Sequence, residues 1–132
     1  KAKTLVDVTE KCLEIGIRQV KPGNKTWNIG YEISKYAEAR GFSVVREYTW
    51  HWIWVHFHEE PYIFHKSNKN TWVTIKPWMI FTIEPMINCG DYKTKTLWDW
   101  WTVKTLDWSL SAQFEHTILV TEKGHEILTL PD

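Results

Sequence analysis

The feature that most constrains the fold is a change in hydrophobic periodicity at Gly41. Before it, apolar residues recur three and four positions apart over residues 4–20 and again over residues 26–41, which is typical of amphipathic helices. A Pro-Gly pair separates the two segments, and we expect Thr26 to cap the start of the second helix and Gly41 its end. After Gly41 the period becomes two and β-branched and aromatic residues accumulate, which predicts strands.

The second part of the chain is predicted to form a sheet. The expected strands lie at residues 42–48, 50–58, 72–75, 80–86, 101–104, 111–121 and 126–130. Glu59, Glu60 and Pro61 are expected to end the second strand, and the last two strands are expected to form a terminal hairpin. The fold class that follows is α+β, with two amphipathic helices packed on a mostly antiparallel sheet. At 132 residues we expect a single domain over residues 1–132.

Composition excludes some classes of function. The chain has 16 Lys and Arg against 16 Asp and Glu, so it lacks the basic surplus that nucleic-acid binding requires. Its apolar stretches are shorter than a membrane helix, and its first residues do not resemble a secretory signal, so we expect a soluble, cytoplasmic protein without membrane partners. Cys12 and Cys89 are too few for a disulfide framework and are expected to be reduced.

Three ionisable residues are candidates for chemistry. Glu84 and Glu115 each stand within a predicted apolar strand, where a carboxylate is costly unless it is paired, protonated or bound to a metal. If His51 converges with them, one imidazole and two carboxylates would suit a transition metal. The alternative is that all three lie on solvated strand faces.

A second histidine pattern is less specific. His56 and His58 are two positions apart, which places both side chains on one face of a strand. Two such imidazoles could contribute to a zinc site, but a third and a fourth ligand would be needed. Solvent-facing or aromatic-packed histidines are the alternative.

Five stretches carry a resemblance to a known family. They are GFSVVREY at 41–48, FHEEP at 57–61, FTIEPMIN at 81–88, WTVKT at 101–105 and SLSAQFEHT at 109–117. Together they closely resemble the C-terminal half of bacterial type I methionine aminopeptidases, and the resemblance runs from about residue 4 to residue 130. It implies one half of the pita-bread fold, in which two pseudo-symmetric αβ halves enclose a dinuclear metal site that removes the initiator methionine.

The resemblance also implies roles for individual residues. His51, Glu84 and Glu115 match metal ligands of the family, and His58 matches a histidine that contacts substrate. The donor set suits divalent cobalt, manganese, iron or zinc, and two such ions would polarise the scissile carbonyl and activate water. The family takes two further aspartate ligands from its N-terminal half, and none of the five aspartates in this sequence matches them.

Tryptophan is the main departure from the family. The chain has ten, and Trp50, Trp52, Trp78 and Trp100 stand where the family has glycine. Glycine at such positions permits unusual backbone angles or close approach, and tryptophan permits neither. The accumulation of tryptophan at these glycine positions predicts an engineered chain.

The sequence leaves several functions open. The first is an engineered, catalytically inactive module that needs no cofactor and whose partner is a second copy, as a homodimer, or a designed protein. The expected interface comprises Trp50, Trp52, Trp54, Trp72, Trp78, Trp98, Trp100 and Trp108. The alternatives are a monomer repacked by tryptophan, a residual metal-dependent aminopeptidase using His51, Glu84 and Glu115, and a metal-binding protein without catalysis that adds His56 or His58.

Overall fold

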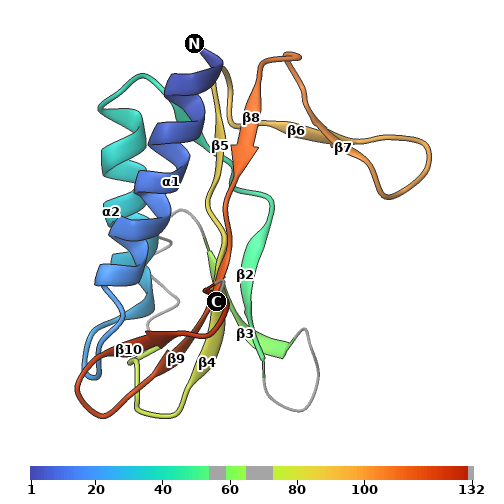
Figure 1. Cartoon of the computed structure of the whole chain (residues 1–132). Coiled ribbons are helices and arrows are strands. Elements are labelled where there is room, and N and C mark those ends of the chain that lie inside the picture. Colours follow the sequence, from blue (N-terminus) through green and yellow to red (C-terminus); the bar gives the residue numbers. More distant parts are fainter. Residues whose placement is uncertain (54–58, 65–72, 131–132) are drawn as a thin grey trace.

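Two helices cover one side of the molecule (Figure 1). The computed structural model describes residues 1–53, 59–64 and 73–130, and within them α1 spans Ala2–Arg18 and α2 spans Thr26–Glu38. Both predicted helices are confirmed. The predicted N-cap is wrong, because Thr26 is the first helical residue and the preceding Lys25 makes no side-chain cap hydrogen bond. Gly41 follows α2 with a positive φ of 77°, and the next N–H, that of Phe42, returns to the Ala37 carbonyl.

The strands form two antiparallel sheets and a separate hairpin. They are β1 Ser43–Val44, β2 Thr49–Trp52, β3 Glu59–Phe64, β4 Ile80–Ile83, β5 Met86–Asn88, β6 Thr94–Thr96, β7 Val103–Thr105, β8 Ser111–Gln113, β9 His116–Val120 and β10 His125–Ile127. One sheet has the order β10-β9-β4-β2-β3, the other has the order β1-β5-β8, and β6 pairs with β7. All of these pairings are antiparallel, so the predicted α+β class is confirmed.

The core lies between the helices and the sheets. Leu5 and Cys12 from α1, Ile29 and Ile33 from α2, and Phe81 from β4 are buried in one apolar cluster. Burial raises the pKa of the Cys12 thiol to about 12, so this thiol stays protonated and unreactive. Both cysteines are free, as expected. In the part of the chain that the structure describes, neither helix is long and apolar enough to cross a membrane.

Two predicted long strands are interrupted. The strand expected at 80–86 divides into β4 and β5 at Glu84 and Pro85, and the strand expected at 111–121 divides into β8 and β9 at Phe114 and Glu115. Proline has no N–H to donate to a ladder, so pairing cannot continue through Pro85. The prediction that both glutamates stand in the middle of a strand is therefore wrong, because each lies in a junction between two strands.

Other strand predictions need smaller corrections. Residues 59–61 do not end a strand but begin β3, whereas the strand expected at 42–48 is reduced to β1. The structure describes residues 73–75 of the strand expected at 72–75, and among them Thr74 forms an isolated β-bridge with Lys25. The sequence did not predict β6, whose residues have no apolar alternation and pair only with β7. The terminal hairpin is confirmed as β9 and β10.

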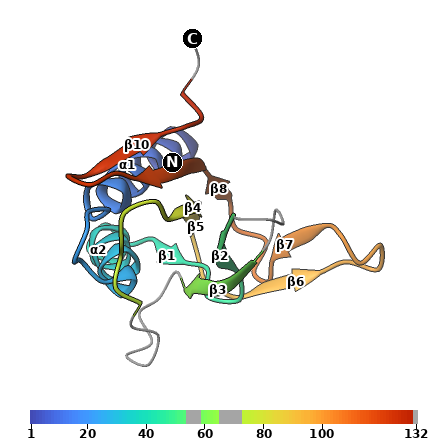
Figure 2. The same cartoon turned by 90° about the horizontal axis from the view of Figure 1, so that it is seen from below.

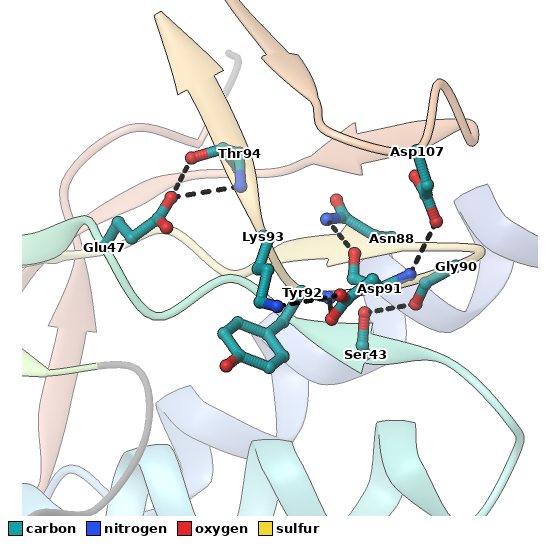
Figure 3. Close-up of polar contacts among 9 residues, drawn as sticks. All are labelled: Ser43, Glu47, Asn88, Gly90, Asp91, Tyr92, Lys93, Thr94 and Asp107. Atoms are coloured by element: carbon teal, nitrogen blue, oxygen red, sulfur yellow. Dashed lines mark hydrogen bonds and ion pairs between the residues drawn. The ribbon is translucent and has the colours of Figure 1, made fainter.

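The β6–β7 hairpin projects away from the helices, and polar contacts hold its base (Figures 2 and 3). The Asp91 N–H donates to Asp107 Oδ2 at 2.7 Å, and the Ser43 hydroxyl donates to the Gly90 carbonyl at 2.6 Å. Glu47 accepts the Thr94 N–H at 3.1 Å. The backbone hydrogen bonds from Asp91 and Ser109 lower the pKa of Asp107 to about 2, so its carboxylate stays charged at neutral pH.

We predict that Gly90→Ala destabilises the fold. A Cβ at position 90 would lie 2.0 Å from Asp107 Oδ2, so the carboxylate would have to leave the Asp91 N–H. Overpacking of this kind costs about 1–3 kcal/mol, which chemical denaturation would measure as a lower free energy of unfolding. Gly124→Ala is the matched control, because nothing lies within 4 Å of its Cβ position. Equal stability of the two variants would contradict the role assigned to Gly90.

Candidate metal centre

His51 lies at an irregularity in the pairing of β2 with β3. The pairing of β2 with β3 shifts register between Trp50 and Trp52, so His51 is outside the regular ladder. Its N–H donates to the hydroxyl of Thr82 on β4 at 3.3 Å, and its side chain is buried. Bulges re-aim side chains and recur beside functional sites. The irregularity in the pairing therefore coincides with the strand position that carries His51.

Glu84 and Glu115 come together because the segment 80–88 pairs with the segment 111–120 on both sides of the two glutamates. On one side of the junctions β4 pairs with β9, up to Ile83 opposite His116. On the other side β5 pairs with β8, starting with Met86 opposite Gln113. The two short unpaired junctions therefore face each other, and each carries one of the carboxylates. The link between Trp52 on β2 and Phe81 on β4 brings His51 to the same place.

The three side chains form a group that could hold a metal ion. One ligand atom from each of His51, Glu84 and Glu115 lies within 4.8 Å of the others. His51 Nε2 and Glu84 Oε1 are 3.9 Å apart. Two atoms that each lie about 2.0–2.2 Å from one ion are at most about 4.4 Å apart, so this pair fits a shared ion without rearrangement. One imidazole and two carboxylates suit manganese, iron, cobalt or zinc.

Burial across the group is graded. His51 is buried, Glu84 is partly buried and Glu115 is exposed. Phe81 and Ile83 of β4 belong to the core beneath the helices, so strand alternation places Thr82 on the opposite face, toward Glu84. The group thus lies on the sheet face away from the helices and is open on the side of Glu115.

Two residues that sequence reasoning missed hold the Glu84 carboxylate. The Thr82 hydroxyl donates to Oε1 at 2.9 Å, and Gln113 Nε2 donates to Oε2 at 3.2 Å. Thr82 carries a weak sequence signal, since residues two apart in a strand share a face with each other. Gln113 carries none, because its approach to Glu84 depends on the pairing of β5 with β8.

A hollow of about 480 Å³ borders the group. It lies between β8 and the β6–β7 hairpin and shares Gln113 with the site. Met86, Tyr48 and Val103 supply apolar surface to it. The hollow is therefore adjacent to the carboxylates, although its lining does not include the three candidate ligands.

The remaining predicted site residues have different outcomes. His56, His58, Trp54 and Trp72 lie outside the described residues. Trp50 and Trp52 lie in β2 on either side of His51. The other members of the predicted interface are exposed, and they are Trp78, Trp98, Trp100 and Trp108.

Comparison with known proteins assigns the chain to a family. Residues 1–122 match the model of Metallopeptidase family M24. The methionine aminopeptidase of Salmonella typhimurium is 57% identical over 126 residues, covering 96% of this chain and 48% of that protein. The methionine aminopeptidase of Escherichia coli is 54% identical over the same length.

Solved structures agree with the sequence comparison. The methionine aminopeptidase of Rickettsia prowazekii superposes with a TM-score of 0.93 at 51% identity, covering 98% of this chain and 52% of that one. The enzyme of Thermotoga maritima gives a TM-score of 0.93 at 40% identity with the same coverage. The resemblance drawn from the sequence motifs is confirmed. The chain spans about half the length of the relatives that it matches.

Proposed function

The chain belongs to metallopeptidase family M24, and from this premise we propose that it is the half of a methionine aminopeptidase that supplies one imidazole and two carboxylates to the metal centre. The observation that carries the proposal is the convergence of His51, Glu84 and Glu115 within 4.8 Å. His51 comes from β2, Glu84 from the junction between β4 and β5, and Glu115 from the junction between β8 and β9. Their convergence therefore depends on the pairing of all these strands.

Each residue has a distinct part in holding the metal. His51 offers Nε2 from a buried position, which limits the competition of water for that ligand. Glu84 is held at both oxygens, by Thr82 and by Gln113, and is therefore oriented before any ion binds. Glu115, the exposed member, faces the open side of the centre. A bound divalent ion supplies Lewis acidity for the scissile carbonyl and lowers the pKa of water.

The proposed activity needs ligands beyond these three. A two-metal site requires more donor atoms than one imidazole and two carboxylates supply. Because the chain spans about half the length of its relatives, we assign the missing donors to a segment outside these 132 residues, in the same polypeptide or in a second one. The inactivity and the cytoplasmic location expected from the sequence stay predictions.

We predict methionine release only when the missing half is supplied. The chain would be mixed with the separately produced N-terminal half of the Salmonella typhimurium relative in cobalt or manganese, and release from a tripeptide that begins with methionine would be measured. The mixture is expected to be active and the chain alone inactive, because the chain alone lacks ligands. A chelator should abolish the activity.

Variants separate catalysis from folding in this assay. Glu84→Gln should remove activity from the mixture, whereas Glu122→Gln, a glutamate in the β9–β10 turn region, should keep it. Both should retain the melting temperature of the parent chain. A folded mixture that binds metal and releases no methionine would overturn the proposed function.

Association through tryptophan is a second candidate function. The loop between β6 and β7 carries three tryptophans that are almost fully exposed, Trp98 at 88%, Trp100 at 89% and Trp101 at 87%. They lie at the end of the hairpin that projects from the body of the fold (Figure 2). Exposed apolar surface of this kind favours association, and aromatic residues dominate interface energetics. The partner we propose is a second copy of the chain.

We predict that the chain with this sequence forms a dimer whose stability depends on the hairpin loop. Light scattering over a concentration series should show the average mass rising from that of a monomer to that of a dimer. The double variant Trp98→Ser/Trp101→Ser should shift the midpoint of this monomer–dimer transition to at least tenfold higher concentration. The same series in chelator controls for association through shared metal ligands. A monomer at all concentrations would contradict the proposal.

A further inference from the structure

Thr82 joins two candidate metal ligands. It lies on β4, is almost completely buried, and faces away from the apolar core that contains its neighbours Phe81 and Ile83. Its hydroxyl oxygen accepts the His51 N–H at 3.3 Å, and its proton goes to Glu84 Oε1 at 2.9 Å. A single hydroxyl therefore contacts the backbone of one ligand and the carboxylate of the other.

These two hydrogen bonds determine how the ligands face each other. The first fixes the backbone of His51 at the point where β2 departs from its regular register. The second directs Oε1, the same atom that lies 3.9 Å from His51 Nε2. We infer that Thr82 is a positioning residue of the metal centre, which sets the separation of the imidazole and the carboxylate. This inference rests on the function proposed above.

Gln113 does not replace Thr82 in this role. Its amide donates to Oε2 and comes from β8, so it restrains the carboxylate but makes no hydrogen bond to His51 in the described structure. Loss of the Thr82 hydroxyl would remove a hydrogen bond to Oε1 and leave the hydrogen bond from Gln113 to Oε2. Groups that orient a metal ligand in this way typically contribute 10–100-fold to metal affinity.

The test is the affinity for Mn²⁺, measured on the full chain by electron paramagnetic resonance. Thr82→Val keeps the shape and removes the hydroxyl, and it should weaken binding by about 10–100-fold. Thr82→Ser should restore binding and the spectrum of the bound ion. Thr9→Val is the control, because Thr9 is also buried and its hydroxyl donates within α1, to the Leu5 carbonyl.

The outcomes separate the inference from the proposed function. If neither the parent chain nor its mixture with the N-terminal half binds Mn²⁺, the proposed function and the positioning role both fail. If the parent binds and Thr82→Val binds equally well, the positioning role alone is overturned. If Thr9→Val weakens binding as much as Thr82→Val, the effect is one of general stability and the positioning role is also overturned.

An independent observation concerns the backbone at three tryptophans. Trp78, Trp100 and Trp108 have φ angles of 72°, 58° and 60°, and in the described residues they are the non-glycine positions with positive φ. Left-handed backbone is uncommon for residues with a Cβ and strained for bulky ones. All three positions lie at turns. The Met79 N–H donates to the Lys76 carbonyl across the turn that contains Trp78, and the N–H groups of Trp100 and Trp108 donate to the carbonyls of Leu97 and Thr105.

The side chains do not account for this strain. Trp78 is 63% exposed, Trp108 is 66% exposed and Trp100 is more exposed still, so little burial compensates at any of the three. Trp108 gains a cation–π contact from Lys95 Nζ, 3.8 Å from its ring centre. This contact between the Lys95 side chain and an exposed ring does not explain why tryptophan stands at position 108, in a turn that favours glycine.

The composition also indicates that tryptophan stands at positions where glycine is expected. The chain has six glycines, whereas average usage of about 7% would give roughly nine in a chain of this length. Tryptophan is in excess, with ten. A codon that one genetic code reads as tryptophan and another reads as glycine would produce both deviations at once. We propose that the polypeptide made in its source cell carries glycine at positions 78, 100 and 108.

Trp101 is the internal control for this proposal. It lies next to Trp100, is as exposed, and does not have a positive φ. Tandem mass spectrometry of the endogenous protein should find glycine at 78, 100 and 108 and tryptophan at 101, and the codon at 101 should differ from the codon shared by the other three. Tryptophan at any of the three positions would overturn the proposal and favour deliberate substitution.

Stability gives a second test on recombinant protein. Trp78→Gly, Trp100→Gly and Trp108→Gly should each raise the melting temperature, by roughly 2–6 °C, because strain at a positive φ is removed. Trp101→Gly should leave it unchanged or lower it. A lower melting temperature in the first three variants would contradict the assignment of these positions to glycine.

Discussion

The metal centre depends on an interruption shared by two paired strands. If 80–88 and 111–120 formed one continuous ladder, their side chains would alternate between the two faces along its whole length. Pro85 has no N–H for that ladder, and the partner strand breaks opposite it at Phe114 and Glu115. Pairing resumes on both sides, so the breaks stay opposite each other. The two carboxylates meet there because the ladder is interrupted, and the helices on the other face hold both sheets in place.

Much of the fold follows from local pattern. The helical spacing before Gly41 and the change of period after it predict both helices and the antiparallel sheet. The candidate ligands follow from residue type, because a carboxylate among apolar strand residues requires an explanation. The local pattern does not show which strands pair, or in which register. The break opposite Pro85, the register shift at His51 and the approach of Gln113 to Glu84 all depend on residues distant in sequence.

The tryptophans show how the structure divides a group that looks uniform in the sequence. From the sequence, Trp78, Trp98, Trp100 and Trp108 belong to one predicted interface, and their neighbour Trp101 lies outside it. The structure separates Trp78, Trp100 and Trp108, where the backbone is left-handed, from Trp98 and Trp101, where it is not. The first set marks turns that favour glycine, and the second provides exposed aromatic surface on the β6–β7 loop. The two sets therefore call for different explanations.

The most direct test of the metal centre is anomalous diffraction from crystals of the chain grown with Mn²⁺. The account predicts an anomalous peak within coordination distance of His51 Nε2 and the carboxylate oxygens of Glu84 and Glu115. That peak should disappear in Glu84→Gln crystals while the positions of β4 and β9 are unchanged. A well-ordered structure in saturating Mn²⁺ with no peak among these three side chains would contradict the account.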